Sequence, residues 1–218
     1  MKGGWVKFEK LLARIIALYG EERKARAIAR AIGRVRGDIE ISRTLELADI
    51  VSQTIGQPPG LQKIHPATRT FQALRIYVND ELGELVRGLA SAENMLGDGG
   101  RLAVVTFHSL EDRIAKKFLA RRTGRAGRPS RHLPETQPSE PSFTELTRKG
   151  LQATEDEISL NPRSRSARLR AATRTSAPAF IFNNTSLTKA LGTAKITMSQ
   201  PSMAALISVY ISTLPSSK

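Results

Sequence analysis

The stretch Gly99–Phe118, GGRLAVVTFHSLEDRIAKKF, predicts a strand that runs directly into a helix. Its first part, Leu102–Phe107, is a continuous apolar run rich in β-branched residues, which is typical of a strand buried on both faces of a mostly parallel sheet. Ser109 and Asp112 have the spacing of a capping box that begins a helix. A strand, a sharp turn and a helix in this order indicate an α/β fold.

His108 lies at the junction between the predicted strand and the predicted helix. Ligands bind at the carboxyl ends of the strands in sheets of this type, so we expect His108 at the mouth of a site. The structural alternative is that its imidazole bonds a neighbouring backbone group and fixes the turn. Ser109 and Asp112 are more simply explained as helix caps than as catalytic groups, so a Ser-His-Asp triad is not indicated.

Helical patterns precede this strand. Apolar residues three and four apart predict a helix over Val6–Tyr19 that ends at Gly20. A second helix is expected over Glu21–Arg36, where two acidic residues precede a basic run as the helix dipole favours. A third is expected to begin at a Thr44 cap and to end at Gly56. Together these segments predict a small helical bundle.

The rest of the chain alternates between patterned and unpatterned segments. After Pro66, the apolar positions from Phe71 to Leu89 predict one long helical region. After the helix that begins at Ser109, we expect an exposed loop over Arg121–Pro141. A short strand over Phe143–Lys149, a helical turn over Glu155–Leu160 and a second strand over Ala167–Ala171 should follow, and the two strands should form a hairpin-like pair. From Ala179 onward the composition changes, with no acidic residue and many serines and threonines.

The composition favours a polyanionic partner. The chain has 34 lysines and arginines against 20 acidic residues, a formal net charge of +14, and only 5% aromatic residues. This balance favours contact with nucleic-acid phosphates over stacking on single-stranded bases. The absence of cysteine excludes disulfides and thiolate metal sites and fits a reducing compartment, so we expect a cytoplasmic protein. No apolar run of about 18 residues occurs, so no membrane partner is expected.

Basic segments are candidates for phosphate contact. The segment NPRSRSARLR, Asn161–Arg170, combines four arginines with two serines and no acidic residue, and arginine forks bind phosphate oxygens bidentately. In KIHPATRT, the residues Lys63, His65 and Arg69 flank a helix start, where an anion site would benefit from the helix N-terminus. The alternatives are a solvated turn for the first segment and a polar connection for the second.

Three motifs in this order resemble the bacterial 16S ribosomal RNA cytosine-N4 methyltransferase family: KIHPATRTFQALRIYVNDEL, GGRLAVVTFHSLEDRIAKKF and NPRSRSARLR. The resemblance extends from Leu11 to Arg174, and YGEERKARAIARAI matches the helical insertion that this family places inside its core. It implies an α/β fold, a partial Rossmann-like S-adenosyl-L-methionine methyltransferase core with an α-helical insertion domain. The implied activity is methylation of the N4 amine of a cytidine in 16S ribosomal RNA of the small ribosomal subunit, with no DNA partner.

The resemblance also assigns domains and site residues. It implies a helical substrate-recognition domain over residues 1–62, the C-terminal part of the methyltransferase core over 63–176 and a divergent tail over 177–218. The expected catalytic-pocket residues are His108, Asn79 and Ser109. The expected RNA-binding residues are Lys63, His65, Arg69, Arg163, Arg165 and Arg168. The family's direct methyl transfer needs no metal and no covalent nucleophile.

One departure from the family bears on activity. Family members carry a glycine-rich loop and an Asp-x-Gly-x-Ser-Ser segment ahead of the helical insertion, and neither occurs in this sequence. Because those elements hold the cofactor, we expect an N-terminally truncated member that binds S-adenosyl-L-methionine weakly or not at all and has little activity alone. The alternatives are a non-catalytic RNA-binding or ribosome-associated module, and a non-functional gene fragment.

Overall fold

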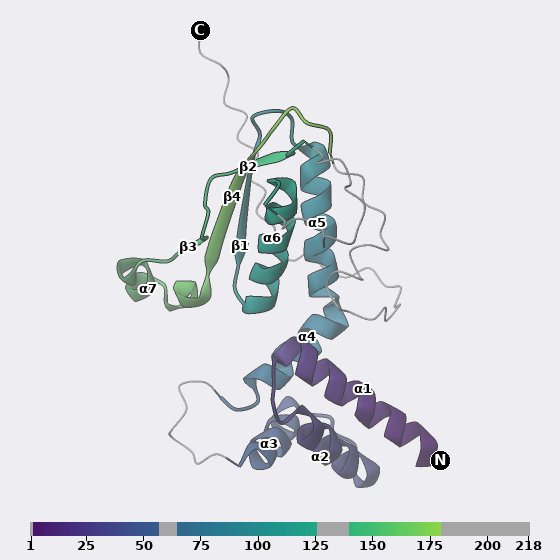
Figure 1. Cartoon of the computed structure of the whole chain (residues 1–218). Helices are drawn as coiled ribbons and strands as arrows, with labels where there is room; N and C mark the ends of the chain where they lie inside the picture. The colour runs from purple at the N-terminus through teal and green to yellow at the C-terminus, as the bar shows by residue number, and fades with distance from the viewer. Residues whose placement is uncertain (1, 57–64, 126–139, 180–218) are drawn as a thin grey trace. The chain divides into compact units, whose positions relative to one another are not determined.

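The computed structural model describes residues 2–56, 65–125 and 140–179, which form two compact units divided between residues 81 and 82 (Figure 1). The tail from residue 180 and most of the predicted loop, residues 126–139, lie outside the described residues. No helix among those described is long and apolar enough to span a bilayer.

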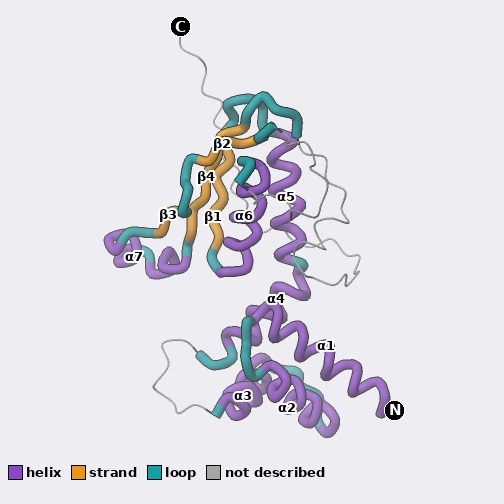
Figure 2. Tube along the Cα trace, in the orientation of Figure 1, coloured by secondary structure: helices purple, strands orange, loops and turns teal. Residues whose placement is uncertain are grey.

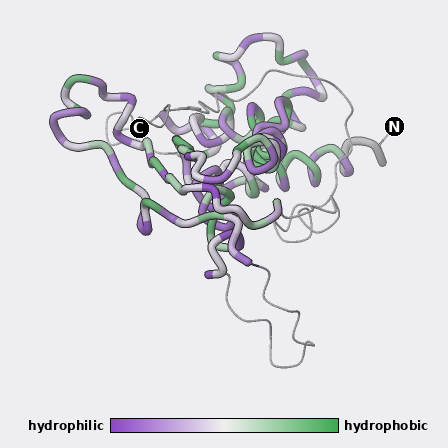
Figure 3. The backbone as a smooth tube through the Cα atoms, turned by 90° about the horizontal axis from the view of Figure 1, so that it is seen from above, coloured by the Kyte–Doolittle hydropathy of each residue, from purple (hydrophilic) through white to green (hydrophobic). Residues whose placement is uncertain are grey.

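The first unit is a helical bundle. Its helices are α1 (Lys2–Gly20), α2 (Ala25–Asp38), α3 (Thr44–Ile55) and α4 (Thr68–Asn79). Apolar residues recur along these helices between hydrophilic ones (Figure 3), and they meet in one core. The most deeply buried members of that core include Ile16, Ile28 and Val51. The bundle predicted from the first three helical patterns is therefore present, and α4 packs with it.

Close packing between α1 and α4 explains the glycine that ends α1. A Cβ at Gly20 would lie 2.5 Å from the backbone oxygen of Arg69, so only glycine permits this approach. The next residue, Glu21, has φ of 49°, in the left-handed region that a helix excludes. Glu21 therefore cannot begin a helix; α2 begins at Ala25, and the prediction that it starts at Glu21 was wrong.

The ends of α3 follow from local hydrogen bonds. Its N-cap is Arg43, and the carboxylate of Glu46 accepts from the backbone N–H groups of Ser42 and Arg43 at 3.0 and 3.1 Å. Thr44, the predicted cap, is the first residue of the helix itself. At the other end Gly56 has φ of 63°, which terminates the helix where the sequence indicated.

The second unit combines helices with a small sheet (Figure 2). In chain order its elements are α5 (Glu81–Met95), β1 (Arg101–Thr106), α6 (Ser109–Arg122), β2 (Phe143–Glu145), β3 (Leu151–Gln152), α7 (Glu155–Leu160), the 3₁₀ turn η1 (Pro162–Ser166) and β4 (Arg168–Arg174). The strand order is β1-β4-β2, and β3 also pairs with β4. Helix α6 lies beside the sheet with α5 next to it, and their apolar residues share a core with β1, β2 and β4. The α/β architecture predicted from the strand-to-helix junction is confirmed.

The strand direction differs from the prediction. All pairings among the described strands are antiparallel, and β1 pairs with β4 from Arg101↔Thr173 to Thr106↔Arg168. Burial alternates along β1, so it is not covered on both faces: Leu102 and Val104 are buried, whereas Val105 is 48% exposed. Both faces of β1 carry apolar residues. The sequence therefore shows a continuous apolar run, from which the alternation of burial cannot be recognised.

The long helical region predicted after Pro66 is two helices. Asp80 has φ of 49° and ends α4, and α5 starts at the next residue. The compact units divide at this point, so α4 belongs to the bundle rather than to the sheet-containing unit. The division lies C-terminal to the boundary expected at residue 62.

Buried charges connect the elements of the second unit. Nε of Arg122 donates to Glu93 Oε2 at 3.0 Å, and Ser142 Oγ donates to Glu93 Oε1 at 2.7 Å. Arg174 donates to the backbone oxygens of Glu93 and Ser142 at 3.3 and 2.9 Å. Glu93 is 1% exposed and Arg122 3%. The predicted exposed loop therefore begins too early, since Arg121 and Arg122 still belong to α6.

Candidate functional site

His108 occupies the end of β1 and the N-cap of α6. Its Nδ1 accepts from the backbone N–H of Glu111 at 3.4 Å. In return, the Glu111 carboxylate accepts from the N–H groups of Phe107 and His108 at 2.8 and 3.3 Å. These bonds form a capping box one residue earlier than the predicted Ser109 and Asp112 pair, and that prediction was wrong. The structural role of His108 is thus present whether or not the imidazole serves a ligand.

The second ring nitrogen of His108, Nε2, does not take part in the capping hydrogen bond that Nδ1 accepts. Nε2 lies 3.3 Å from Glu111 Oε1 but is buried without a well-oriented hydrogen bond to any residue in the described ranges. The side chain is 13% exposed. Sequence reasoning missed Glu111, although its position three residues after His108 is the same spacing that was read from Ser109.

The capping box lowers the pKa of Glu111. Burial alone would raise that pKa, but hydrogen bonds from His108 and from the N–H of Phe107 favour the ionised carboxylate and outweigh burial. A carboxylate whose folded-state pKa is lowered contributes stability that is present above its unfolded pKa. That contribution is lost as the pH falls through the folded value.

Replacing Glu111 with glutamine should therefore flatten the acid side of the stability curve. Between about pH 5 and pH 3, the free energy of unfolding should fall less steeply in the Glu111→Gln variant than in the parent. Above pH 5 the variant should be less stable by about 1 kcal/mol, the usual contribution of a cap. Urea unfolding at a series of pH values measures both effects. Glu155→Gln, at an exposed position of α7, is the control and should follow the parent curve, and parallel curves for all three proteins would contradict the assignment.

The arginine-rich segment Asn161–Arg170 contains both exposed and buried arginines. Arg163 and Arg165 are exposed on η1, where the Asn161 side chain accepts from the N–H of Arg163 at 3.2 Å. Arg170, by contrast, is 4% exposed and donates to both carboxylate oxygens of Asp112 at 2.7 and 3.2 Å. Asp112 is thus a partner of β4, not a helix cap.

The register of the sheet brings His108 and the exposed arginines to one end. Thr106, the last residue of β1, is paired with Arg168, the first residue of β4, and its Oγ1 donates to the Arg168 oxygen at 3.3 Å. His108 and Ser109 follow Thr106, and η1 with Arg163 and Arg165 comes directly before β4. Five of the predicted site residues therefore lie at this end of the second unit, which we call the histidine–arginine end.

The other predicted site residues belong to the first unit. Nδ1 of His65 accepts from the N–H of Ala67 at 3.2 Å and so stabilises the start of α4, whose first turn carries the exposed Arg69. Asn79 ends α4, and its amide donates to Glu81 at 3.4 Å. Lys63 lies outside the described residues.

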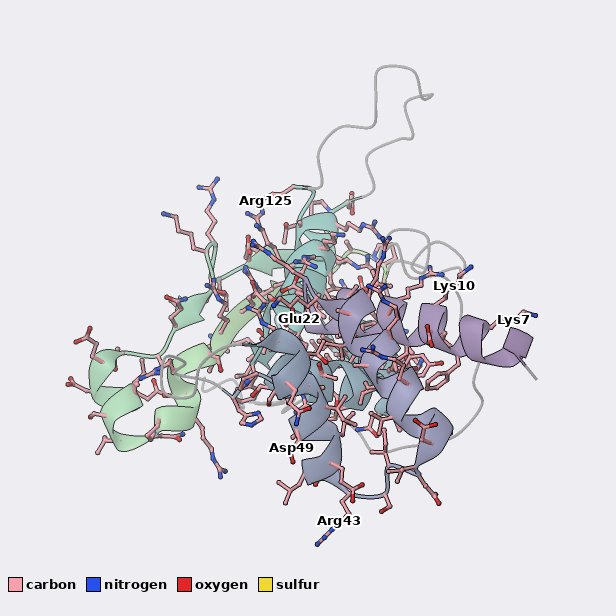
Figure 4. The ribbon with its side chains drawn as sticks, turned by 90° about the horizontal axis from the view of Figure 1, so that it is seen from below. Lys7, Lys10, Glu22, Arg43, Asp49 and Arg125 are labelled. Carbon is pink, nitrogen blue, oxygen red and sulfur yellow. The ribbon has the colours of Figure 1, made fainter. Side chains whose placement is uncertain are left out.

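A basic surface covers one side of α2. Its exposed residues are Arg23, Arg26, Arg30 and Arg34. Lys24 beside them is tied to the bundle, because its ammonium donates to the oxygen of Ile55 at 2.7 Å. On α1, the side chains of Lys7 and Lys10 extend outward (Figure 4). These arginines and lysines display positive charge on the surface of α1 and α2.

A family model described as the MraW methylase family matches residues 7–175. The chain belongs to the MraW methylase family. Among its curated relatives, the ribosomal RNA small subunit methyltransferase H of Parvibaculum lavamentivorans is 63% identical over 168 residues, which are 77% of this chain and 49% of that protein. The proteins of the same name from Nitrobacter hamburgensis and Paramagnetospirillum magneticum are 58% and 57% identical, with 50% and 54% of their lengths covered. The chain spans about half the length of the curated relatives it matches.

The described residues of this MraW methylase chain do not by themselves fit a whole S-adenosyl-L-methionine molecule. The strand-to-helix turns, between β1 and α6 and between β3 and α7, contain no glycine in the described ranges. At the first of these turns, the N–H groups of Phe107, His108 and Glu111 are already engaged in the capping box. The turn is therefore closed to the backbone contacts by which a glycine-rich loop holds a cofactor.

Proposed function

We propose that this chain supplies the RNA-positioning half of an S-adenosyl-L-methionine-dependent methyltransferase that modifies the N4 amine of a cytidine in 16S ribosomal RNA. The curated relatives are named as methyltransferases of small-subunit ribosomal RNA. The observation that carries the proposal is the histidine–arginine end, where the exposed Arg163 and Arg165 lie at the same end of the sheet as the turn that holds His108.

In this proposal the arginines and the histidine have different tasks. Exposed guanidinium groups on η1 bind backbone phosphates and fix the register of the RNA without reading its sequence. His108 and Ser109 line the place where the target base arrives. In the first unit, Lys63, His65 and Arg69 are proposed to bind RNA phosphates, and Asn79 is proposed as a pocket residue. The cofactor supplies the methyl group when bound, and the residues of this chain hold the RNA against it.

By itself the chain is expected to bind RNA but not the cofactor. The chain has a net charge of +14, and exposed basic residues on α1, α2 and η1 account for RNA affinity without methyl transfer. The capped turn at His108 accounts for the absence of a cofactor cradle in the described residues. The cytosol, where ribosomal subunits are assembled and modified, is the compartment that this role requires.

Arginines at the histidine–arginine end should carry part of the salt dependence of RNA binding. Each single-strand phosphate contact contributes a log-log slope of about −0.7. The double variant Arg163→Ala/Arg165→Ala should therefore bind a 16S ribosomal RNA fragment more weakly and with a slope reduced by about 1.4. Filter binding at several salt concentrations measures both quantities.

The matched control removes the same charge from the opposite end of the unit. Arg101 begins β1 and Arg121 lies in the last turn of α6, and both are exposed. Arg101→Ala/Arg121→Ala should leave the slope closer to that of the parent. Equal reductions for the two double variants would show that the RNA recognises total charge, and this result would contradict the proposed placement of the RNA.

A further inference from the structure

One apolar side chain is displayed beside the arginines of η1. Leu160, the last residue of α7, is 88% exposed, the highest value for a large apolar side chain in the described ranges. Only Asn161 separates it from η1, on which Arg163 and Arg165 are exposed. Isolated exposed leucines are common on protein surfaces. This one, however, lies beside guanidinium groups that are proposed to bind RNA.

Hydrogen bonds of Asn161 fix the joint between α7 and η1. Its N–H donates to the Glu157 oxygen at 2.8 Å and closes the last turn of α7. Its Oδ1 accepts from the N–H of Arg163 at 3.2 Å, and its backbone oxygen accepts from the N–H and the hydroxyl of Ser164 at 2.9 and 2.8 Å. Ser164 itself is 5% exposed. The backbone on both sides of Leu160 is therefore ordered, and the fold holds its side chain in solvent.

Charge changes sign along this part of the chain, residues 155–166, which we call the arm (Figure 1). Its exposed charged residues are Glu155, Asp156 and Glu157 in the first turn of α7 and Arg163 and Arg165 on η1. Phosphates are repelled by the first group and attracted by the second, so an RNA strand bound to the arm lies on η1. Leu160 lies where the favourable charge ends. The apolar surfaces that RNA offers to such a side chain are the faces of its bases, which are accessible where the stack is open.

The proposed reaction requires the target base to leave its stack. Enzymes that modify a base within a helix extrude the nucleotide into their site, and extrusion costs the stacking of that base on its neighbours. Nucleic-acid-binding proteins insert apolar wedges, leucine among them, between such base steps, and they combine these wedges with cationic side chains on the same surface. Leu160 and the arginines that follow it have this combination.

We propose that Leu160 is a wedge that enters the base stack of 16S ribosomal RNA when the target cytidine leaves it, while Arg163 and Arg165 hold the adjacent phosphates. The inference rests on the proposed RNA contact of η1, and it assigns a role to a side chain that phosphate binding alone leaves without one. The wedge acts before methyl transfer and needs no cofactor. Its effect is therefore measurable on RNA bound to the full chain.

Fragments of 16S ribosomal RNA with the fluorescent base pyrrolo-cytosine at one cytidine at a time report extrusion, because the fluorescence of this base rises when it leaves the stack. At saturating concentration, the full chain should raise the fluorescence about twofold or more at one position. Leu160→Ala should abolish most of this rise while the salt slope of binding stays that of the parent, because no phosphate contact is lost. Leu160→Met keeps an apolar side chain of similar volume and should restore the rise.

Leu146→Ala is the matched control, because Leu146 is 56% exposed and lies outside the arm, and it should give the parental rise. Arg163→Ala/Arg165→Ala should bind more weakly but give the rise once the RNA is saturated. All these variants should unfold in urea like the parent, since each replaced side chain is exposed. Binding without a rise at any cytidine, or a parental rise with Leu160→Ala, would overturn the wedge and leave the RNA contact intact. Failure of the chain to bind the RNA would contradict both the wedge and the proposed function.

Discussion

Replacement of Glu93 with glutamine should lower the free energy of unfolding of the second unit by about 3 to 5 kcal/mol. The Glu93 carboxylate is 1% exposed, and it accepts from Arg122 at 3.0 Å and from Ser142 at 2.7 Å. Burial lowers the pKa of Arg122, and Glu93 opposes that effect by favouring the charged guanidinium. Glutamine keeps the shape of the side chain but leaves the Arg122 cation buried without a countercharge.

Urea unfolding together with hydrogen exchange at the buried amides of β4 measures this loss. Exchange at Ala172, which is fully buried, reports on the second unit and not on the helical bundle. Glu84→Gln is the matched control, because Glu84 pairs with Arg87 at 2.6 Å on the surface of the same helix and both side chains are at least one-third exposed. Glu84→Gln should lower the free energy of unfolding by no more than about 1 kcal/mol. If both variants lost similar amounts of unfolding free energy, burial would not increase the contribution of the Glu93–Arg122 pair to stability.

The positions of the helices and strands were largely predictable, because apolar periodicity depends only on local spacing. The ends of α1 at Gly20 and α3 at Gly56, and the helical turn Glu155–Leu160, follow such local signals. The antiparallel direction of β1 relative to β4 does not follow from a local signal. Its partner β4 starts 62 residues after the last residue of β1, and no local pattern records which way that segment returns.

The candidate site was predictable in its residues but not in their roles. His108 was placed at the end of a strand, where the structure has it, yet the sequence pattern assigned its cap to Ser109 and Asp112. A shift of one residue separates the two capping boxes, and composition cannot choose between them. The arginines present the same difficulty, since a sequence does not show which guanidinium meets a carboxylate from a distant segment.

Arg168 and Arg170, two residues apart on β4, should respond in opposite ways to replacement with alanine. The strand alternation turns Arg170 toward α6, where Asp112 holds its guanidinium at 2.7 and 3.2 Å, and leaves Arg168 partly exposed. Arg170→Ala should destabilise the second unit by about 2 to 3 kcal/mol. This loss lies below the range for wholly buried pairs, because Asp112 is 17% exposed and regains contact with water. Arg168→Ala should change stability by no more than about 0.5 kcal/mol.

RNA binding should show the reverse order. Arg168→Ala should lower the affinity for a 16S ribosomal RNA fragment and reduce the salt slope by about one phosphate contact, whereas Arg170→Ala, measured at low temperature where the unit remains folded, should keep the parent slope. A double-mutant cycle with Asp112→Ala separates the pair from other effects of Arg170, and a coupling energy of at least about 1 kcal/mol is expected. A loss of RNA affinity in Arg170→Ala without loss of stability would place this arginine on the RNA. That result would mean that the Asp112 pair opens when RNA binds.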